Sequence, residues 1–177
     1  MKKAIYIITG VMAAGKSTIA EAFALRLEKS VHLRGDVFRK MIVRGREDMS
    51  DSPSKEALRQ LDMRHCLTAS AAIDYYNNGF TVVVQDNFLG DKLSDFSDLL
   101  NPYPTYIVVL NPTLQTIEQR EYNRQKKGYT GFSVESLHDG FLRETPRIGL
   151  WLDTSEMTIE RVVKEIENRV EKEGLIR

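Results

Sequence analysis

Residues 10–17 read Gly10-Val11-Met12-Ala13-Ala14-Gly15-Lys16-Ser17, which matches the pattern G-x-x-x-x-G-K-S/T at every position. The stretch follows a continuous apolar run at 4–9, which is typical of a strand buried on both faces. The residues after it carry apolar side chains at helical spacing, from Ile19 to Leu27. The pattern therefore lies between a strand and a helix, the context in which it has structural meaning.

This pattern predicts a loop that binds phosphate through its backbone. Gly10 and Gly15 permit backbone angles that a Cβ would block, so successive N–H groups can point at phosphate oxygens. The helix that begins near Lys16 adds the positive end of its dipole. We expect Lys16 to reach the β- and γ-phosphates and Ser17 to ligate Mg²⁺. The residues predicted to hold the nucleotide in this loop are Gly10, Ala13, Ala14, Gly15, Lys16, Ser17 and Thr18. The alternative is a tight glycine turn with an exposed Lys16.

Length and composition limit the class of protein. The 177 residues suggest one domain over 1–177. Twenty-five basic and twenty-five acidic side chains cancel, which argues against a general polyanion-binding protein. Cys66 is the only cysteine, which excludes an internal disulfide and a cysteine-rich zinc site, and the three histidines have no metal-ligand spacing.

The first residues resemble a signal peptide, with Lys2 and Lys3 before an apolar run. We interpret them otherwise, because Thr9 and Gly10 interrupt the run and cleavage there would destroy the loop. No later stretch has the ~20 apolar residues that a membrane helix needs. We therefore expect a cytoplasmic protein without a membrane partner.

Short apolar runs alternate with longer amphipathic ones along the chain. This order predicts a parallel five-stranded sheet with helices on both faces, a three-layer α/β/α fold. The strands are expected at 4–9, 31–34, 80–84, 105–110 and 148–152. Besides the helix after the loop, helices are expected at 36–44, 55–76, 113–127, 134–143 and from 159 onward, and an exposed loop at 46–54.

Two acidic residues follow predicted strands, at the sheet edge where ligands bind in α/β folds. Asp36 comes after a turn at Gly35, where a carboxylate can accept a proton from an attacking hydroxyl. The alternative is that Asp36 caps a helix starting at Val37. Asp86 ends the strand after Gln85, and an acidic residue there can orient Mg²⁺. The alternative for Asp86 is an ordinary turn residue.

Arg120 and Arg124 lie four residues apart, late in a predicted helix, and so share one face. Two guanidinium groups could clamp a transferring phosphoryl group from a lid, or they could form a solvated helix end. Asp153 closes the last strand, where a nucleobase could rest. Its alternative role is a helix cap.

Together these residues resemble the P-loop kinase superfamily, in its nucleoside-monophosphate-kinase-like branch. The loop, Asp36, the stretch 86–90, the stretch 120–124 and the pair Asp153-Thr154 are similar to chloramphenicol phosphotransferase. The sequence is also similar to zeta-toxin-like kinases, polynucleotide 5′-hydroxyl kinases and AAA_33-type small kinases. The resemblance implies the strand order 2-3-1-4-5, a helical lid at about 120–131, ATP as phosphate donor and Asp36 as base.

The chain also departs from this family. An acidic residue is expected where Gln85 stands, so Mg²⁺ organisation rests more on Asp86. Lys127 replaces a third lid arginine, and an ammonium is a poorer bidentate phosphate clamp. The stretch 37–61, where an acceptor would bind, has no clear match.

The leading hypothesis is therefore an ATP- and Mg²⁺-dependent kinase that phosphorylates a hydroxyl of a small molecule. Lys16, Asp36, Arg120 and Arg124 are its predicted catalytic residues, Arg120 and Asp153 also contact the nucleotide, and Ser17 and Asp86 serve the metal. A polynucleotide 5′-hydroxyl kinase is the second hypothesis, with a basic groove formed by Arg34, Arg39, Lys40, Arg44 and Arg46. A non-catalytic nucleotide-dependent switch is the third. The sequence does not reveal the oligomeric state.

Overall fold

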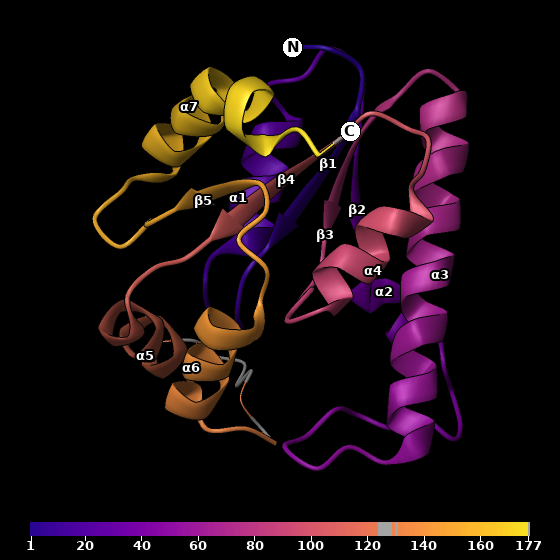
Figure 1. Cartoon of the computed structure of the whole chain (residues 1–177), viewed down its shortest axis with the longest axis vertical. Helices are drawn as coiled ribbons and strands as arrows, with labels where there is room; N and C mark the ends of the chain where they lie inside the picture. The colour runs from indigo at the N-terminus through magenta and orange to yellow at the C-terminus, as the bar shows by residue number, and fades with distance from the viewer. Residues whose placement is uncertain (124–128, 130, 177) are drawn as a thin grey trace.

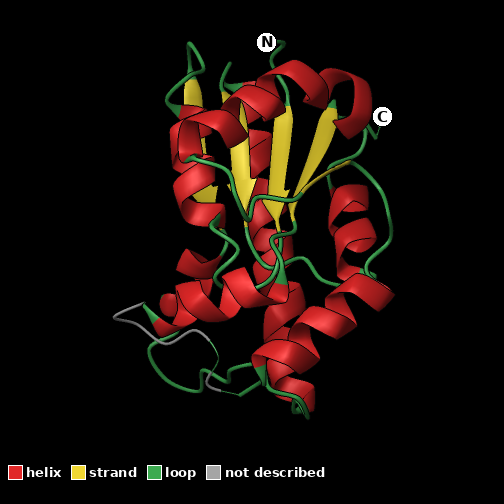
Figure 2. Cartoon of the chain, turned by 90° about the vertical axis from the view of Figure 1, so that its left-hand side faces the viewer, coloured by secondary structure: helices red, strands yellow, loops and turns green. Residues whose placement is uncertain are grey.

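The fold is built on one five-stranded parallel sheet, which the computed structural model shows between helices on both faces (Figures 1 and 2). The structure describes residues 1–123, 129 and 131–176. The strand order is β2-β3-β1-β4-β5, and neighbouring strands run parallel. The strands are β1 Ile5–Thr9, β2 Ser30–Arg34, β3 Thr81–Gln85, β4 Thr105–Leu110 and β5 Leu150–Leu152. The predicted fold class and strand order are confirmed.

The three middle strands form the core of the molecule. β1, β3 and β4 are buried along their whole length, because helices cover both faces of the sheet. β1 lies between the other two, with Ile5 opposite Val82 on one side and Thr105 on the other. The same register places Ile8 beside Gln85, so β1 and β3 end at the same edge of the sheet.

The helices pack in two groups. α1 contacts α7 on one face of the sheet, whereas α3 contacts α2 and α4 on the opposite face (Figures 1 and 2). Among the described residues, no helix is both long enough and apolar enough to cross a membrane. The helices are α1 Lys16–Ala24, α2 Asp36–Lys40, α3 Lys55–Asn77, α4 Lys92–Leu99, α5 Leu114–Tyr122, α6 Val134–Glu144 and α7 Ile159–Arg169, followed by a π-helical turn, η1, at Val170–Gly174.

One helix of the structure has no counterpart in the sequence prediction. α4 fills the connection between β3 and β4, and its buried residues are Leu93, Phe96 and Ser97. The ring of Phe96 stacks on Phe88 at a centroid distance of 4.0 Å. The signal was present, since Leu93, Phe96 and Leu100 recur at helical spacing and are all fully buried.

Three predicted elements are shorter in the structure by two residues or more. α2 ends at Lys40 rather than 44, because the chain tightens after it: the Ile42 N–H donates to the Arg39 carbonyl three residues back. Val43 is 94% exposed, so continuing the helix would bury nothing. β5 begins at Leu150 rather than 148, after a turn in which Ile148 donates to Pro146. α5 ends at Tyr122; most of the predicted remainder, residues 124–127, lies outside the described residues.

The site residues predicted from the sequence, where the structure describes them, lie at or beyond the carboxyl edge of the sheet. α2, α5 and α6 lie past this edge, and the N-terminal part of α3 extends past it as well (Figure 1). The loop at 41–54 contacts the segment before α6, because the Asp51 N–H donates to the Gly131 carbonyl at 3.1 Å. Two segments distant in sequence therefore meet at the lower end of the molecule, beyond the sheet (Figure 1).

Candidate active site

The glycine-rich loop between β1 and α1 has the backbone of a phosphate-binding loop. Gly10 lies so close to β4 that a Cβ there would be 2.4 Å from the Leu110 carbonyl oxygen, which explains why this position is glycine. Ala13 has φ 64, a left-handed conformation that costs a residue with a Cβ about 1–2 kcal/mol. The Ala14 N–H donates to the Val11 carbonyl and closes the turn at 3.2 Å. Strain of this kind is typical of ligand-binding loops.

α1 begins differently from the helices whose N-termini carry a side-chain cap. Four helices begin with a serine or threonine whose hydroxyl accepts a backbone N–H; these caps are Ser54, Thr113, Ser133 and Thr158. Gly15 stands at this position of α1 and makes no such bond. The positive end of α1 therefore faces the loop without a capping side chain, as anion binding requires.

The three residues after Gly15 differ in their surroundings. Lys16 is buried, and its ammonium donates to the Val11 carbonyl at 2.7 Å, inside the curve of the loop. The Ser17 hydroxyl donates to Gln85 Oε1 at 3.1 Å. Thr18 lies on the exposed side of α1. The structure thus places Lys16 and Ser17 at the loop, next to the end of β3.

Asp36 is the first residue of α2 and is separated from the end of β2 by Gly35 alone. Its carboxylate accepts hydrogen bonds from Arg39 Nε at 2.8 Å and forms an ion pair with Lys40 Nζ at 2.7 Å. Partial burial alone would raise the pKa of Asp36, but Lys40 and Arg39 outweigh it and hold that pKa at about 2. The predicted alternative, a cap for a helix starting at Val37, is wrong: the N-cap residue is Gly35, and no side chain caps α2.

Asp86 lies deeper in the protein, below the turn between β2 and α2. Its Oδ2 lies 3.1 Å from Arg64 Nε, and its Oδ1 accepts the N–H of Asn87 at 2.8 Å. Burial raises the pKa of Asp86, while the Arg64 charge opposes that rise. The charges of Lys16 and Asp36 also act on Asp86, so these ends of β1, β2 and β3 share one electrostatic site. Sequence reasoning missed Arg64, because nothing in α3 distinguishes it from the other arginines.

Arg120 lies in the last turn of α5 and connects two segments. Its guanidinium donates to the Ala14 carbonyl at 3.2 Å and to the Thr154 carbonyl at 2.9 Å. It therefore joins the glycine-rich loop to the segment after β5, which carries Asp153. The Asp153 carboxylate accepts two bonds from Ser155, which hold its pKa below the usual range. The alternative role of Asp153 as a helix cap is wrong, since Thr158 caps α7.

Tyr129 is a further contact to the loop that sequence reasoning missed. Its hydroxyl donates to the Met12 carbonyl at 2.8 Å, and its N–H donates to the buried Glu121 at 3.3 Å. Arg124, the second predicted lid arginine, lies outside the described residues, as does much of the predicted lid at 120–131. Its role stays a prediction.

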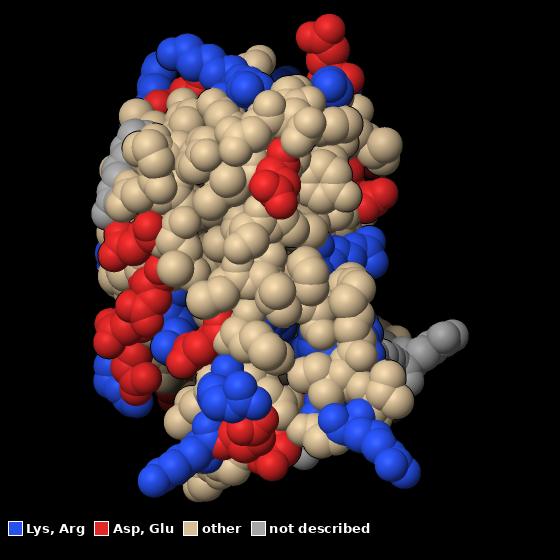
Figure 3. Space-filling model, turned by 90° about the vertical axis from the view of Figure 1, so that its right-hand side faces the viewer, with Lys and Arg blue, Asp and Glu red and all other residues tan. Residues whose placement is uncertain are grey.

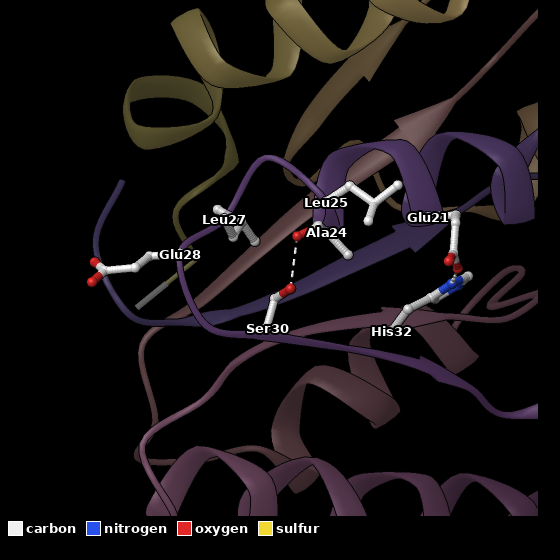
Figure 4. A pocket seen from close by; sticks show the side chains of 7 residues that line it. All are labelled: Glu21, Ala24, Leu25, Leu27, Glu28, Ser30 and His32. Atoms are coloured by element: carbon white, nitrogen blue, oxygen red, sulfur yellow. Dashed lines mark hydrogen bonds and ion pairs between the residues drawn. The ribbon is translucent and has the colours of Figure 1, made fainter.

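A surface hollow of about 360 Å³ lies apart from the predicted site residues, between α1 and the edge strand β2 (Figure 4). Glu21 and His32 meet in it, with 2.5 Å between the carboxylate and Nδ1, and Ser30 donates to the Ala24 carbonyl at 2.7 Å. None of the residues predicted from the sequence to bind nucleotide lines this hollow. The chemistry-bearing residues therefore belong to the strand ends rather than to this hollow.

Both a family profile and solved structures of similar fold match this chain. The profile of the AAA_33 family, described as AAA domain, matches residues 5–141. No curated protein matches the chain. The chain is similar in fold to a sugar kinase from Janibacter sp. HTCC2649 (TM-score 0.70, 16% identity, covering 96% of this chain and 95% of that one).

Two further solved structures are similar over nearly the whole chain. The Deinococcus radiodurans tunicamycin resistance protein has a TM-score of 0.69 at 17% identity and 99% coverage of both chains. Shikimate kinase from Bacteroides thetaiotaomicron has a TM-score of 0.62 at 16% identity, covering 95% of this chain and 98% of that one. At these identities the structures establish the fold. The family match spans well over half of the sequence, and the protein belongs to the AAA_33 family.

Proposed function

We propose that the protein is a kinase that transfers the γ-phosphoryl group of ATP to a hydroxyl of a small molecule. One observation carries this proposal: an uncapped loop-to-helix turn with a buried lysine lies near an ionised carboxylate beyond the end of β2, and the charges of Lys16 and Asp36 both act on Asp86. A loop of this kind suits the phosphate donor, and Asp36 suits the acceptor. The solved structures of similar fold include proteins named as kinases of small molecules.

In this proposal the donor phosphates lie along the loop amides. Lys16 would exchange its bond to Val11 for the β- and γ-phosphates. Arg120, fixed between Ala14 and Thr154, would lie beside the nucleotide with Asp153. Arg124 would stabilise the transferring group from the lid. Such catalysis is mostly positioning and electrostatic stabilisation.

Asp36 would act on the acceptor hydroxyl. The hydroxyl oxygen bonds to the γ-phosphorus, the bond to the bridging oxygen of ADP breaks, and the hydroxyl proton passes to the carboxylate. A carboxylate with a pKa of about 2 is a weak base. Phosphoryl transfer through a loose transition state needs little proton abstraction early on. We therefore infer that Asp36 mainly orients the hydroxyl and accepts its proton late.

The residues present fit Mg²⁺ held jointly with a nucleotide. Ser17 Oγ and Gln85 Oε1 are oxygen atoms, which Mg²⁺ prefers, and Asp86 adds negative charge nearby. Within the described residues, no three His, Cys, Asp or Glu side chains form a metal cluster, so phosphate oxygens would supply most ligands. When bound, the ion would neutralise charge on the phosphates.

The polynucleotide kinase hypothesis needs a basic groove near Asp36, and the structure gives it little support. Four of its five proposed cations lie within 4 Å of a carboxylate, since Arg34 approaches Glu21, Arg39 and Lys40 approach Asp36, and Arg46 approaches Asp48. On the face shown in Figure 3, basic and acidic side chains intermingle at the lower end, uncharged surface dominates the middle, and charged side chains of both signs lie at the upper end as well. Cations that are already paired with carboxylates attract a phosphate backbone less strongly, so this region suits a small acceptor better than a nucleic acid.

A label-transfer experiment tests the proposal. Wild-type protein and Lys16→Ala receive [γ-³²P]ATP, Mg²⁺ and a cell extract that is afterwards divided by a size cutoff. Label in a new small species, present with wild type and absent with Lys16→Ala, is the expected result. Label in a nuclease-sensitive large fraction would favour the polynucleotide kinase instead. Release of phosphate alone would leave two readings, an extract that lacks the acceptor or a nucleotide-dependent switch.

Asp36→Asn tests the acceptor side. The variant keeps the size of the side chain and removes its charge, so we expect it to bind ATP as the wild type does and to lose label transfer. Undiminished transfer by Asp36→Asn would remove Asp36 from the reaction. Transfer by Lys16→Ala would contradict the proposed function as a whole.

A further inference from the structure

The Ser17 hydroxyl contacts a neutral side chain, Gln85, at the end of β3. Gln85 ends β3 beside Ile8 of β1 and is only 8% exposed, and its Oε1 accepts the Ser17 hydroxyl at 3.1 Å. In P-loop proteins Mg²⁺ is held by the loop serine or threonine and by an aspartate at a strand end. In this protein the group at the end of β3, the strand next to β1, is the neutral amide of Gln85, and it contacts Ser17.

The adjacent acid, Asp86, does not take the place of Gln85 beside the Ser17 hydroxyl. Both oxygens of Asp86 have other neighbours: Oδ1 accepts the N–H of Asn87, and Oδ2 lies beside Arg64. Oδ2 also fills the space under Gly35, where a Cβ would be 2.2 Å away. Asp86 can act on the metal through its charge, but in this arrangement it does not contact the Ser17 hydroxyl.

The Ser17 hydroxyl needs an acceptor for its proton if its oxygen binds a cation. A serine hydroxyl has one proton and two lone pairs. If a lone pair points to a cation, the proton must go to another acceptor, and Gln85 Oε1 is the acceptor in place. A carboxylate there would accept the same proton and would also add a negative charge close to the cation.

We propose that Gln85 is a positioning residue that orients the Ser17 hydroxyl toward Mg²⁺, and that its neutral amide makes Mg²⁺ binding with nucleotide weaker than an acid would. This inference rests on the proposed function. It deepens that function by assigning the strand-end group of the metal site to Gln85.

Nucleotide binding tests this without knowledge of the acceptor. The affinity of a fluorescent ATP analogue is measured against Mg²⁺ concentration, and the midpoint of its Mg²⁺ dependence is compared between variants. Gln85→Met keeps the length and loses the oxygen; we expect its midpoint to rise about 10–100-fold, as for partners of metal ligands generally. Gln85→Glu is expected to lower the midpoint about tenfold.

Two controls separate positioning from charge and from folding. Asn87→Asp adds the same charge two residues away and should shift the midpoint much less than Gln85→Glu. In a Ser17→Ala background, Gln85→Met should cause no further shift, since the hydroxyl it orients is gone. Thermal unfolding of every variant shows whether it folds, and Gln85→Glu provides a second test if Gln85→Met does not.

The outcomes are distinguishable. Unchanged midpoints in both Gln85 variants, or an equal effect of Gln85→Met with and without the Ser17 hydroxyl, would overturn the positioning role and leave the kinase proposal standing. A wild type that binds no nucleotide, or binds it without regard to Mg²⁺, would overturn the proposed function itself.

Discussion

Gly35 is glycine for reasons of space rather than conformation. Its φ of −59 is ordinary for any residue, yet a Cβ would lie 2.2 Å from Asp86 Oδ2 and 3.0 Å from Thr68 Oγ1. Because Gly35 has no side chain, the Asp86 carboxylate and its partner Arg64 can pack against the turn that precedes Asp36. Both charged side chains are nearly buried, at 5% and 11% exposure.

Gly35→Ala should therefore destabilise the protein by about 1–3 kcal/mol, the range for overpacking. Urea unfolding at pH 7 measures this difference in the free energy of unfolding. Gly140→Ala is the matched control, because Gly140 lies within α6 and a Cβ there meets nothing within 4 Å. The control should stabilise the protein by about 0.5–1 kcal/mol. Equal effects at both positions would refute the steric argument.

The buried pair of Arg64 and Asp86 supports a second prediction. Arg64→Met leaves a buried carboxylate without its partner and should cost about 3–5 kcal/mol at pH 7. The folded-state pKa of Asp86, already raised by burial, would rise further without Arg64. Because that pKa then lies above its unfolded value, the penalty is present at neutral pH and shrinks as the pH falls toward it.

Urea unfolding of Arg64→Met at pH 7 and pH 5 measures this trend. The double variant Arg64→Met with Asp86→Leu removes both charges and should regain much of the lost stability. A double variant as unstable as the single one would mean that packing, rather than the unpaired charge, causes the loss.

At the scale of elements, an aromatic cluster joins α3 to α4. The ring of His65 lies 5.0 Å from Phe88 and 5.9 Å from Phe96 by centroids. Phe88 is in turn fixed to the end of β1, because its N–H and carbonyl both bond to the Thr9 hydroxyl. Burial lowers the pKa of His65 from 6.5 to about 4.

A His65 pKa below its unfolded value makes stability depend on pH. The neutral ring contributes fully above pH 6.5, and that contribution is lost as the pH falls toward 4, where unfolded chains bind the proton first. The loss should be about 3 kcal/mol for the wild type. His65→Phe keeps an aromatic ring in the cluster and should lose less between pH 6.5 and 4 by urea unfolding. Identical pH profiles of the two proteins would exclude His65 as the cause.

Periodicity located most elements, for identifiable reasons. β4 was predicted at its observed bounds, because prolines enclose a fully buried run, and α3 was predicted to within one residue. α4 was missed, since its few apolar residues follow a polar turn and their neighbours are charged. α2 was predicted too long, because its end depends on a tight turn that apolar spacing does not encode.

At the scale of the whole molecule, the site is assembled from segments far apart in the sequence. Residues with a recognisable motif or position, such as Lys16 and Asp36, could be proposed from the sequence. Their partners could not, because Arg64 and Tyr129 acquire meaning only when α3 and the segment before α6 meet the strand ends. Gln85 was noticed as a departure, but its contact with Ser17 required the β1–β3 register.

Arg120 connects the glycine-rich loop to the segment after β5, so a nucleotide bound at the loop, as proposed, would also depend on this connection. A ligand bound only by the folded protein stabilises it by about 2.7 kcal/mol at 100 times its dissociation constant. For a chain of this size that gain corresponds to a rise in Tm of roughly 5–10 °C. We expect a non-hydrolysable ATP analogue with Mg²⁺ to produce such a rise in the wild type, and Lys16→Ala to lose most of it.

Arg120→Met should reduce the same rise, because it releases the loop from the segment that carries Asp153. Arg147→Met is the matched control: Arg147 lies 4.0 Å over the ring of Trp151, and within the described part of the chain it forms no hydrogen bond or ion pair with the loop. The control should keep the full ligand-induced rise even if its own Tm falls, since loss of stacking affects free and bound protein alike. If Arg120→Met kept the whole rise, the connection between the loop and the segment after β5 would serve the fold and not the nucleotide.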